Sequence, residues 1–237
     1  MFEHRSGAKE VLDERMRSTG DSAFLRQSYR AMFTANRHLG SLGTLKDFIF
    51  SECQHLCGDR PLRVLDVGAG DARVGEELAQ WAYRRGIPIE LTCLDANRGA
   101  VELARKRLAT GPAPGLRVLH GRIGCHLPVE NYDCAMGSLF FHHFTGPEIL
   151  DLLAHLRRIV RRSVVINDLR RSPLPYMGLL GLYPFVPPAV WRDALLSVRR
   201  GFRGEELRRL LKLVPDSTFE VEEVFLFRVV GRIRFTR

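Results

Sequence analysis

The sequence predicts an α/β fold in which a mostly parallel sheet is covered by helices on both faces. Between residues 62 and 169, short apolar runs of strand length alternate regularly with helical patterns. Strands that alternate with helices are joined by right-handed crossovers, which make neighbouring strands parallel. The first 60 residues contain helical patterns without strands. We therefore expect a helical cap over residues 1–60 and an α/β domain over residues 61–237.

The individual elements follow from apolar periodicity and from the glycine and proline residues that end each run. In the cap, helical spacing covers residues 7–18, 23–39 and 44–56. In the α/β domain, strands are predicted at residues 62–67, 89–95, 116–121, 132–140 and 163–169, with helices at 72–85, 97–109 and 147–160. A helix at 204–214 precedes two strand-like runs, 218–224 and 225–235, which are close enough to pair as a hairpin.

Residues 170–188 interrupt this alternation. Their five prolines exclude a regular helix throughout, and many of the other side chains are large and apolar, including Met177 and Phe185. Such a segment either packs as ordinary core or lines a ligand pocket. Because it follows the fifth strand, we expect an apolar cap insertion at about residues 170–200 that lines a pocket.

Composition narrows the class of protein. A hydrophobic content of 45% and a charged content of 27% are ordinary for a soluble globular chain. The net charge of +9 suits nucleic acid, an anionic membrane surface or an acidic substrate. The arginines are spread along the chain, which makes a nucleic-acid partner unlikely but leaves peripheral membrane contact open. Five cysteines without a Cys-x-x-Cys pair predict no metal site, and the lack of an apolar N-terminal stretch predicts a cytoplasmic protein.

The segment "VLDVGAGDA", residues 64–72, reads as strand, tight turn and helix, a turn that brings backbone close to a ligand. A dinucleotide site would have a third glycine where Arg73 stands, and the carboxylate of Asp66 would repel a pyrophosphate. The same carboxylate attracts a cation, and S-adenosylmethionine carries a sulfonium and an ammonium group. Asp66 therefore favours S-adenosylmethionine over NAD, the alternative being a tight turn without a ligand.

Asp95 ends the second predicted strand, 25 residues after Gly70. An acid at this place accepts hydrogen bonds from both hydroxyls of a ribose, whether the cofactor is NAD or S-adenosylmethionine. It predicts an adenosine-type ligand without choosing between the two cofactors.

Four segments, "VLDVGAGDA", "LTCLDAN", "NYDCAMGSLFFHHF" and "VVINDL", resemble the successive motifs of class I S-adenosylmethionine-dependent methyltransferases over residues 62–169. The resemblance implies a Rossmann-like three-layer sandwich with a seven-stranded sheet whose last strand is antiparallel. The segments "ANRHLGSLG" and "RRIVRRSVVINDLRRSPLP" further resemble bacterial small-molecule methyltransferases associated with type III polyketide synthases, which modify phenolic or pyrone lipids.

The resemblance also implies residue roles. The methionine end of S-adenosyl-L-methionine would be held by Asp66, Gly68, Ala69 and Gly70, the ribose by Asp95, and the adenine by Ala96 and Asn97. The floor of the methyl-transfer site would be Gly137, Ser138 and Leu139. The chain departs from the family at Ala72, in the third glycine position, and at Arg122, which stands where an acid commonly contacts the adenine amino group; Arg122 and Ile123 are still expected to bind the cofactor. Apart from the resemblance, Arg37 of the cap could reach the cofactor carboxylate, the alternative being a solvated surface arginine.

Two adjacent histidines, His142 and His143, follow the fourth strand. A phenolic acceptor must lose its proton, and histidine is the side chain best suited to accept it near neutral pH. Adjacent side chains point in different directions, so we expect one base at most and favour His143; the alternative is that the histidines only hold the loop. The leading hypothesis is methylation of an oxygen on a small aromatic or lipid-like acceptor. The alternatives are an acceptor on carbon, RNA or protein, and a non-catalytic protein that binds S-adenosylmethionine.

Overall fold

The computed structural model describes residues 4–8, 22–38, 40–55, 60–111, 113–124, 131–180, 188–224 and 227–236. Most of the helix expected over residues 7–18 lies outside these ranges, and residues 7 and 8 are not helical.

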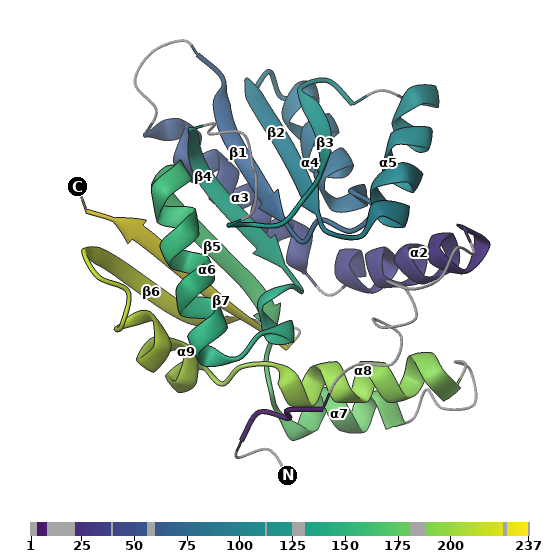
Figure 1. Cartoon of the computed structure of the whole chain (residues 1–237), viewed down its shortest axis with the longest axis vertical. Coiled ribbons are helices and arrows are strands. Elements are labelled where there is room, and N and C mark those ends of the chain that lie inside the picture. Colours follow the sequence, from purple (N-terminus) through teal and green to yellow (C-terminus); the bar gives the residue numbers. More distant parts are fainter. Residues whose placement is uncertain are drawn as a thin grey trace.

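The sheet has seven strands in the order β3-β2-β1-β4-β5-β7-β6 (Figure 1). The first five strands pair in parallel, and β7 is antiparallel to both of its neighbours, β5 and β6. This topology confirms the expected fold, including the antiparallel last strand and the C-terminal hairpin. The strands are β1 (Leu62–Val67), β2 (Ile89–Asp95), β3 (Leu116–His120), β4 (Tyr132–Ser138), β5 (Val160–Leu169), β6 (Ser217–Val224) and β7 (Arg228–Phe235).

Helices cover both faces of the sheet and make the three layers. Successive residues of a strand point to opposite faces, and Val64 and Leu65 of β1 accordingly belong to different core clusters. The cluster around Val64 is completed by α3 (Ser41–Gln54), α4 (Arg73–Arg84) and α5 (Arg98–Thr110). The cluster around Leu65 is completed by α6 (Gly146–Ile159) and α9 (Gly204–Leu211).

Three further helices lie near the carboxyl ends of the parallel strands (Figure 1). Helix α2 (Ser22–His38) contacts α3 and α5, whereas α7 (Pro173–Leu180) and α8 (Pro188–Arg200) follow β5 and pack against each other. Pro173 and Pro175 do not prevent α7 because they lie in its first turn, where a missing N–H removes no helical hydrogen bond. The sequence patterns did not predict α8 as a helix.

A single turn of 3-10 helix, η1 (Phe141–His143), follows β4 and carries both candidate histidines. Because β1, β2, β4 and β5 are parallel neighbours, the segments that leave their carboxyl ends meet at one edge of the sheet. The glycine turn, Asp95 and η1 are therefore brought together although they lie far apart in the sequence.

Candidate active site

A cavity of about 570 Å³ opens at this edge of the sheet, between the carboxyl ends of β1, β2 and β4 and helix α2. Most residues that the sequence predicted for cofactor binding line it, together with one of the two histidines. These residues are Asp66, Gly68, Ala69, Gly70, Asp95, Ala96, Asn97, Arg122, Ile123, Ser138, Leu139 and His143.

Three of the predicted site residues do not line the cavity. Gly137 is buried against the ring of Phe141, where a β-carbon would lie 2.6 Å from a ring atom, so it serves packing within the sheet. Arg37 is exposed near the end of α2 and is outside the cavity lining. His142 is buried beneath the loop instead of facing the cavity. The structure therefore does not place these three predicted residues in the wall of the cavity.

The glycine turn after β1 needs residues without a β-carbon. Gly68 and Gly70 have φ angles of 68° and 57°, in the left-handed region that glycine adopts most easily. A β-carbon at Gly68 would overlap the ring of Phe140, and one at Gly70 would lie 2.7 Å from the ring of Tyr29. Ala72, in the third glycine position, keeps the left-handed conformation with a φ of 60° and begins α4. The departure from the family pattern therefore preserves the shape of the turn.

Asp66 is a buried carboxyl at the end of β1, and it lines the cavity. Burial first, and then the nearby charge of Asp95, raises the pKa of Asp66 to about 8, against a hydrogen bond from the Cys93 thiol that lowers it. Burial without a positive partner disfavours the charged form of a carboxyl. A cationic ligand in the cavity would supply the missing partner.

Asp95 holds the turn in place from the neighbouring strand. Its two carboxylate oxygens accept hydrogen bonds from the backbone N–H groups of Gly70 and Asn97, both at 2.7 Å. The side chain of Asn97 in turn accepts a hydrogen bond from the Ala100 N–H and caps the start of α5. A carboxylate has about four acceptor positions, so Asp95 retains the capacity to bind ribose hydroxyls.

The two histidines have separate environments. The Nδ1 atom of His142 lies 2.7 Å from one carboxylate oxygen of Asp168, and the His142 backbone N–H donates to the other at 3.0 Å. Burial alone would raise the pKa of Asp168, but attraction to His142, together with hydrogen bonds from His142 and from the Leu169 N–H, lowers it to about 2. Asp168 is therefore an ionised carboxylate that holds η1 from beneath. His142 makes the contacts expected of a histidine that holds the loop, which was the alternative to a role as the base.

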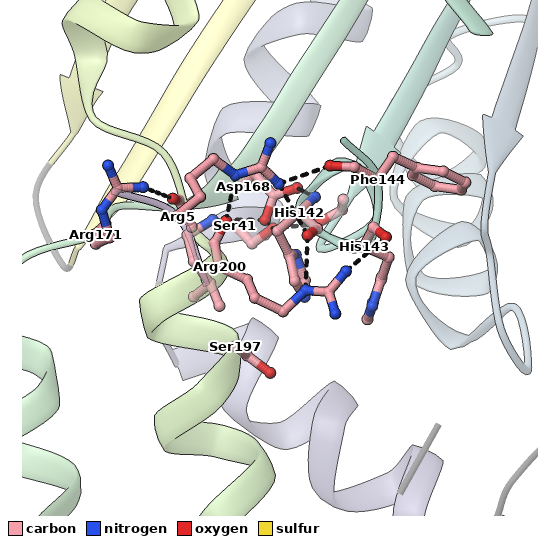
Figure 2. A network of polar contacts seen from close by, with 12 residues as sticks. Arg5, Ser41, His142, His143, Phe144, Asp168, Arg171, Ser197 and Arg200 are labelled. Atoms are coloured by element: carbon pink, nitrogen blue, oxygen red, sulfur yellow. Dashed lines mark hydrogen bonds and ion pairs between the residues drawn. The ribbon is translucent and has the colours of Figure 1, made fainter. Parts of the chain in front are cut away.

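His143 stacks on His142 with ring centroids 4.0 Å apart, and it lines the cavity (Figure 2). The two rings lie side by side, so the expectation that adjacent histidines point in different directions does not hold, although of the two only His143 lines the cavity. Among the two, His143 is the one placed to meet a ligand.

Aromatic side chains that the sequence did not single out as site residues also line the cavity. Tyr29 and Phe33 come from α2, and Phe140 and Phe144 flank η1. Met177, from the apolar segment after β5 that was expected to line a pocket, is 64% exposed and is not part of the cavity lining, and Phe185 lies outside the described residues. The sequence of α2 shows apolar residues at helical spacing. This spacing cannot distinguish a helix face that lines a cavity from a face that packs in the core.

A chain of side chains fastens the floor of the cavity to α3. The Ser138 hydroxyl lies 2.8 Å from that of Ser41, and the Asn167 amide donates to the Ser41 hydroxyl at 2.6 Å. Leu139 follows with a φ of 53°, and its N–H donates to the Asn167 carbonyl at 3.0 Å. A non-glycine residue in this region is strained, and such strain is common at functional sites.

Residues 64–163 match the family model described as "Methyltransferase domain". The match runs from β1 into β5 and includes the glycine turn, Asp95 and η1. Together with the chemistry of the cavity, it supports a methyltransferase that uses S-adenosylmethionine. No curated protein sequence gives a significant match to the chain.

Solved methyltransferase structures share the fold. The plantazolicin methyltransferase BpumL, in complex with a triazolic desmethylPZN analog and SAH, has a TM-score of 0.70 at 16% identity, over 96% of this chain and 95% of that one. Magnesium protoporphyrin IX methyltransferase (ChlM) from Synechocystis PCC 6803 with bound SAH has a TM-score of 0.64 at 13% identity, over 95% and 99%. The methyltransferase SibL, in its apo form, has a TM-score of 0.65 at 21% identity, over 99% of this chain and 64% of its own.

Proposed function

We propose that the chain is an S-adenosylmethionine-dependent methyltransferase that transfers a methyl group to an oxygen of a small aromatic or lipid-like acceptor. The observation that carries this proposal is one cavity that combines two carboxylates, Asp66 and Asp95, with His143 and several aromatic rings. The carboxylates suit a cationic adenosine cofactor, and the histidine and rings suit a flat acceptor with an ionisable hydroxyl.

The residues of the cavity fit the cofactor. Asp66 would hold the ammonium group, the glycine turn would let the methionine part approach the backbone, and Asp95 would bind the ribose. Bound S-adenosylmethionine supplies an electrophilic methyl group activated by its sulfonium. The SAH named with the structures of BpumL and ChlM supports the same cofactor for this chain.

The acceptor chemistry falls to His143 and the rings around it. The ring of His143 would accept the proton of a phenolic hydroxyl, and bound S-adenosylmethionine would supply the methyl group that takes the place of that proton. The rings of Tyr29, Phe140 and Phe144 orient a flat acceptor and exclude water. Much of the rate of such a displacement comes from alignment of the two reactants.

The acceptor class rests on this lining and on the neighbours. BpumL is a plantazolicin methyltransferase and ChlM a magnesium protoporphyrin IX methyltransferase. Acceptors of limited size are consistent with a 570 Å³ cavity, and phenolic or pyrone lipids of polyketide origin match its aromatic walls.

Within the described ranges, no helix is long and apolar enough to cross a membrane, and Cys53, Cys93 and Cys134 are free thiols.

Titration calorimetry tests the cofactor. S-adenosylmethionine or its product SAH should bind, and NAD should not, because the buried carboxyl of Asp66 offers a partner to a cation and none to a pyrophosphate. Tight NAD binding without a signal from S-adenosylmethionine would overturn the proposal.

A methyl-transfer assay with a labelled methyl group tests the acceptor. Phenolic lipids should become labelled at oxygen. Label in bulk RNA or protein, or at carbon, would overturn the acceptor class and would leave the proposed cofactor unaffected.

Replacing Asp95 by alanine should raise the dissociation constant of SAH by roughly 10- to 150-fold, since it removes charged hydrogen bonds worth about 1.5–3 kcal/mol. The loss of the bonds to Gly70 and Asn97 should also loosen the glycine turn. The matched control is Glu102→Ala, which removes an exposed carboxylate of α5 that pairs with Arg98. An unchanged constant for Asp95→Ala in a folded protein would show that the ribose lies elsewhere.

A further inference from the structure

Two arginines hold the backbone of the η1 turn from outside the sheet (Figure 2). Arg5 donates from Nη2 to the carbonyls of His142 and Phe144, both at 2.9 Å. Arg200 donates from Nε to the carbonyl of His142 at 3.0 Å and from Nη2 to that of His143 at 2.6 Å. Three successive carbonyls thus receive guanidinium donors from two distant parts of the chain.

The same arginines join the N-terminal segment to the end of α8. Arg5 donates from Nε to the carbonyl of Arg200 at 2.8 Å, and Arg200 donates from Nη1 to the carbonyl of Ala8 at 2.6 Å. The Arg5 guanidinium also lies 4.2 Å from the centroid of the Phe202 ring. Residues 5–8 therefore form an ordered strap, which we call the N-terminal strap, between α8 and η1.

The turn is held from its inner side as well. Asp168 accepts hydrogen bonds from the backbone N–H and the ring of His142, while the arginines bind the carbonyls on the outer side. A helical turn of three residues cannot satisfy these groups within itself, so external partners determine its orientation. With η1 fixed on both sides, the direction of the His143 side chain is fixed relative to the cavity.

The charges of this cluster fit such a role. Burial lowers the pKa of Arg5, and attraction to Asp168 and Glu206 opposes that shift. Burial of a guanidinium is costly unless its donors are hydrogen-bonded, and the carbonyls of His142 and Phe144 accept those of Arg5.

We propose that Arg5 and Arg200 are positioning residues for the transfer reaction. They fix η1 so that His143 meets the acceptor, and the N-terminal strap thereby becomes part of the active site. This inference rests on the proposed function, in which His143 is the base. Misplacement of a catalytic group by about 1 Å can cost roughly 100-fold in rate, so a contact with the backbone alone is sufficient to matter.

The kinetic test combines Arg5→Ala with His143→Gln. Arg5→Ala should lower kcat by roughly 10- to 100-fold, with little change in the KM for S-adenosylmethionine or in the melting temperature. In the His143→Gln background, Arg5→Ala should cause no further loss, because the residue acts through His143. Arg5→Lys should restore only part of the rate, since an ammonium cannot reproduce the fork that binds several carbonyls. Multiplicative losses in the double variant would overturn the proposal.

The matched control is Arg209→Ala, which removes an exposed arginine of α9 paired with Glu205 and should leave kcat unchanged. Arg200→Ala repeats the test from the other side of the turn and should show the same dependence on His143. If the Arg5 variant does not fold, this second variant decides the question.

A second measurement needs no acceptor. In protein with ¹³C-labelled histidine, the ring signal of His143 is identified by its loss in His143→Gln. Arg5→Ala should shift or broaden that signal, and Arg209→Ala should not. An unchanged His143 signal in Arg5→Ala would overturn the positioning role. Failure of the proposed function would appear separately, as absence of S-adenosylmethionine binding and methyl transfer in the parent protein.

Discussion

Replacing His143 by glutamine should lower turnover by roughly 10²–10⁴-fold if this residue is the general base. The dissociation constant of SAH and the melting temperature should hardly change, because His143 lines the cavity while His142 makes the buried contacts with Asp168. The loss should shrink for acceptors that are acidic enough to ionise unaided, since these need no base. Steady-state kinetics over a series of phenols of decreasing pKa measures the effect.

His142→Ala provides the contrasting variant. It leaves the buried Asp168 carboxylate without its ring donor and should lower the free energy of unfolding by about 1–3 kcal/mol. A large fall in stability for His143→Gln, with equal losses for every acceptor, would assign His143 a structural role as well and would remove the base from the proposed mechanism.

Replacing Asp66 by asparagine should weaken the binding of S-adenosylmethionine by roughly 10- to 150-fold, the equivalent of about 1.5–3 kcal/mol for a charged hydrogen bond. Burial first, and then the charge of Asp95, raises the pKa of Asp66 to about 8, so the free protein carries this carboxyl mostly protonated at pH 7. A bound ammonium favours the carboxylate. Binding at pH 7 should therefore release close to one proton, and Asp66→Asn should abolish that release.

The same pKa predicts how stability depends on pH. Unfolded, Asp66 titrates near its ordinary value of 3.8, whereas in the free folded protein it titrates at about 8. Between about pH 4 and pH 8, the unfolded state has lost this proton and the folded state keeps it. The contribution of Asp66 to the free energy of unfolding therefore falls progressively as the pH rises through this range. Asp66→Asn should remove this contribution. Calorimetry in buffers of different ionisation enthalpy measures the proton release on binding, and thermal unfolding from pH 5 to 9 measures the pH dependence of stability. A parent protein that releases no proton on binding would contradict the prediction.

Local patterns predicted the parallel strands and the glycine turn well, for a physical reason. Buried strands are near-continuous apolar runs, and a turn that must adopt positive φ shows its glycines. Because parallel strands place their carboxyl ends at one edge, the positions of Asp66, Asp95 and His143 just after their strands were sufficient to predict that these residues meet.

Features that depend on distant partners could not be predicted in this way. Nothing adjacent to His142 and His143 shows which of them is buried, because Asp168 decides it from 26 residues away. The contacts of Arg5 with η1 span more than 130 residues, and no sequence period marks them. Helix α7 was missed since prolines usually signal a break, although in the first turn of a helix they are harmless.

The position of β7 has a consequence for the order in which a growing chain can complete its active site. β7 lies between β5 and β6 and pairs Asn167 with Val230 and Asp168 with Val229. During synthesis from the N-terminus, β5 presents an unpaired edge until residues near 230 have emerged, and such edges invite association with other chains. Asp168 holds the η1 turn from that same strand, so the support of this turn is completed only when the last strand inserts. Chains that terminate early should therefore be both inactive and prone to aggregate. The absence of the same strand would cause both effects.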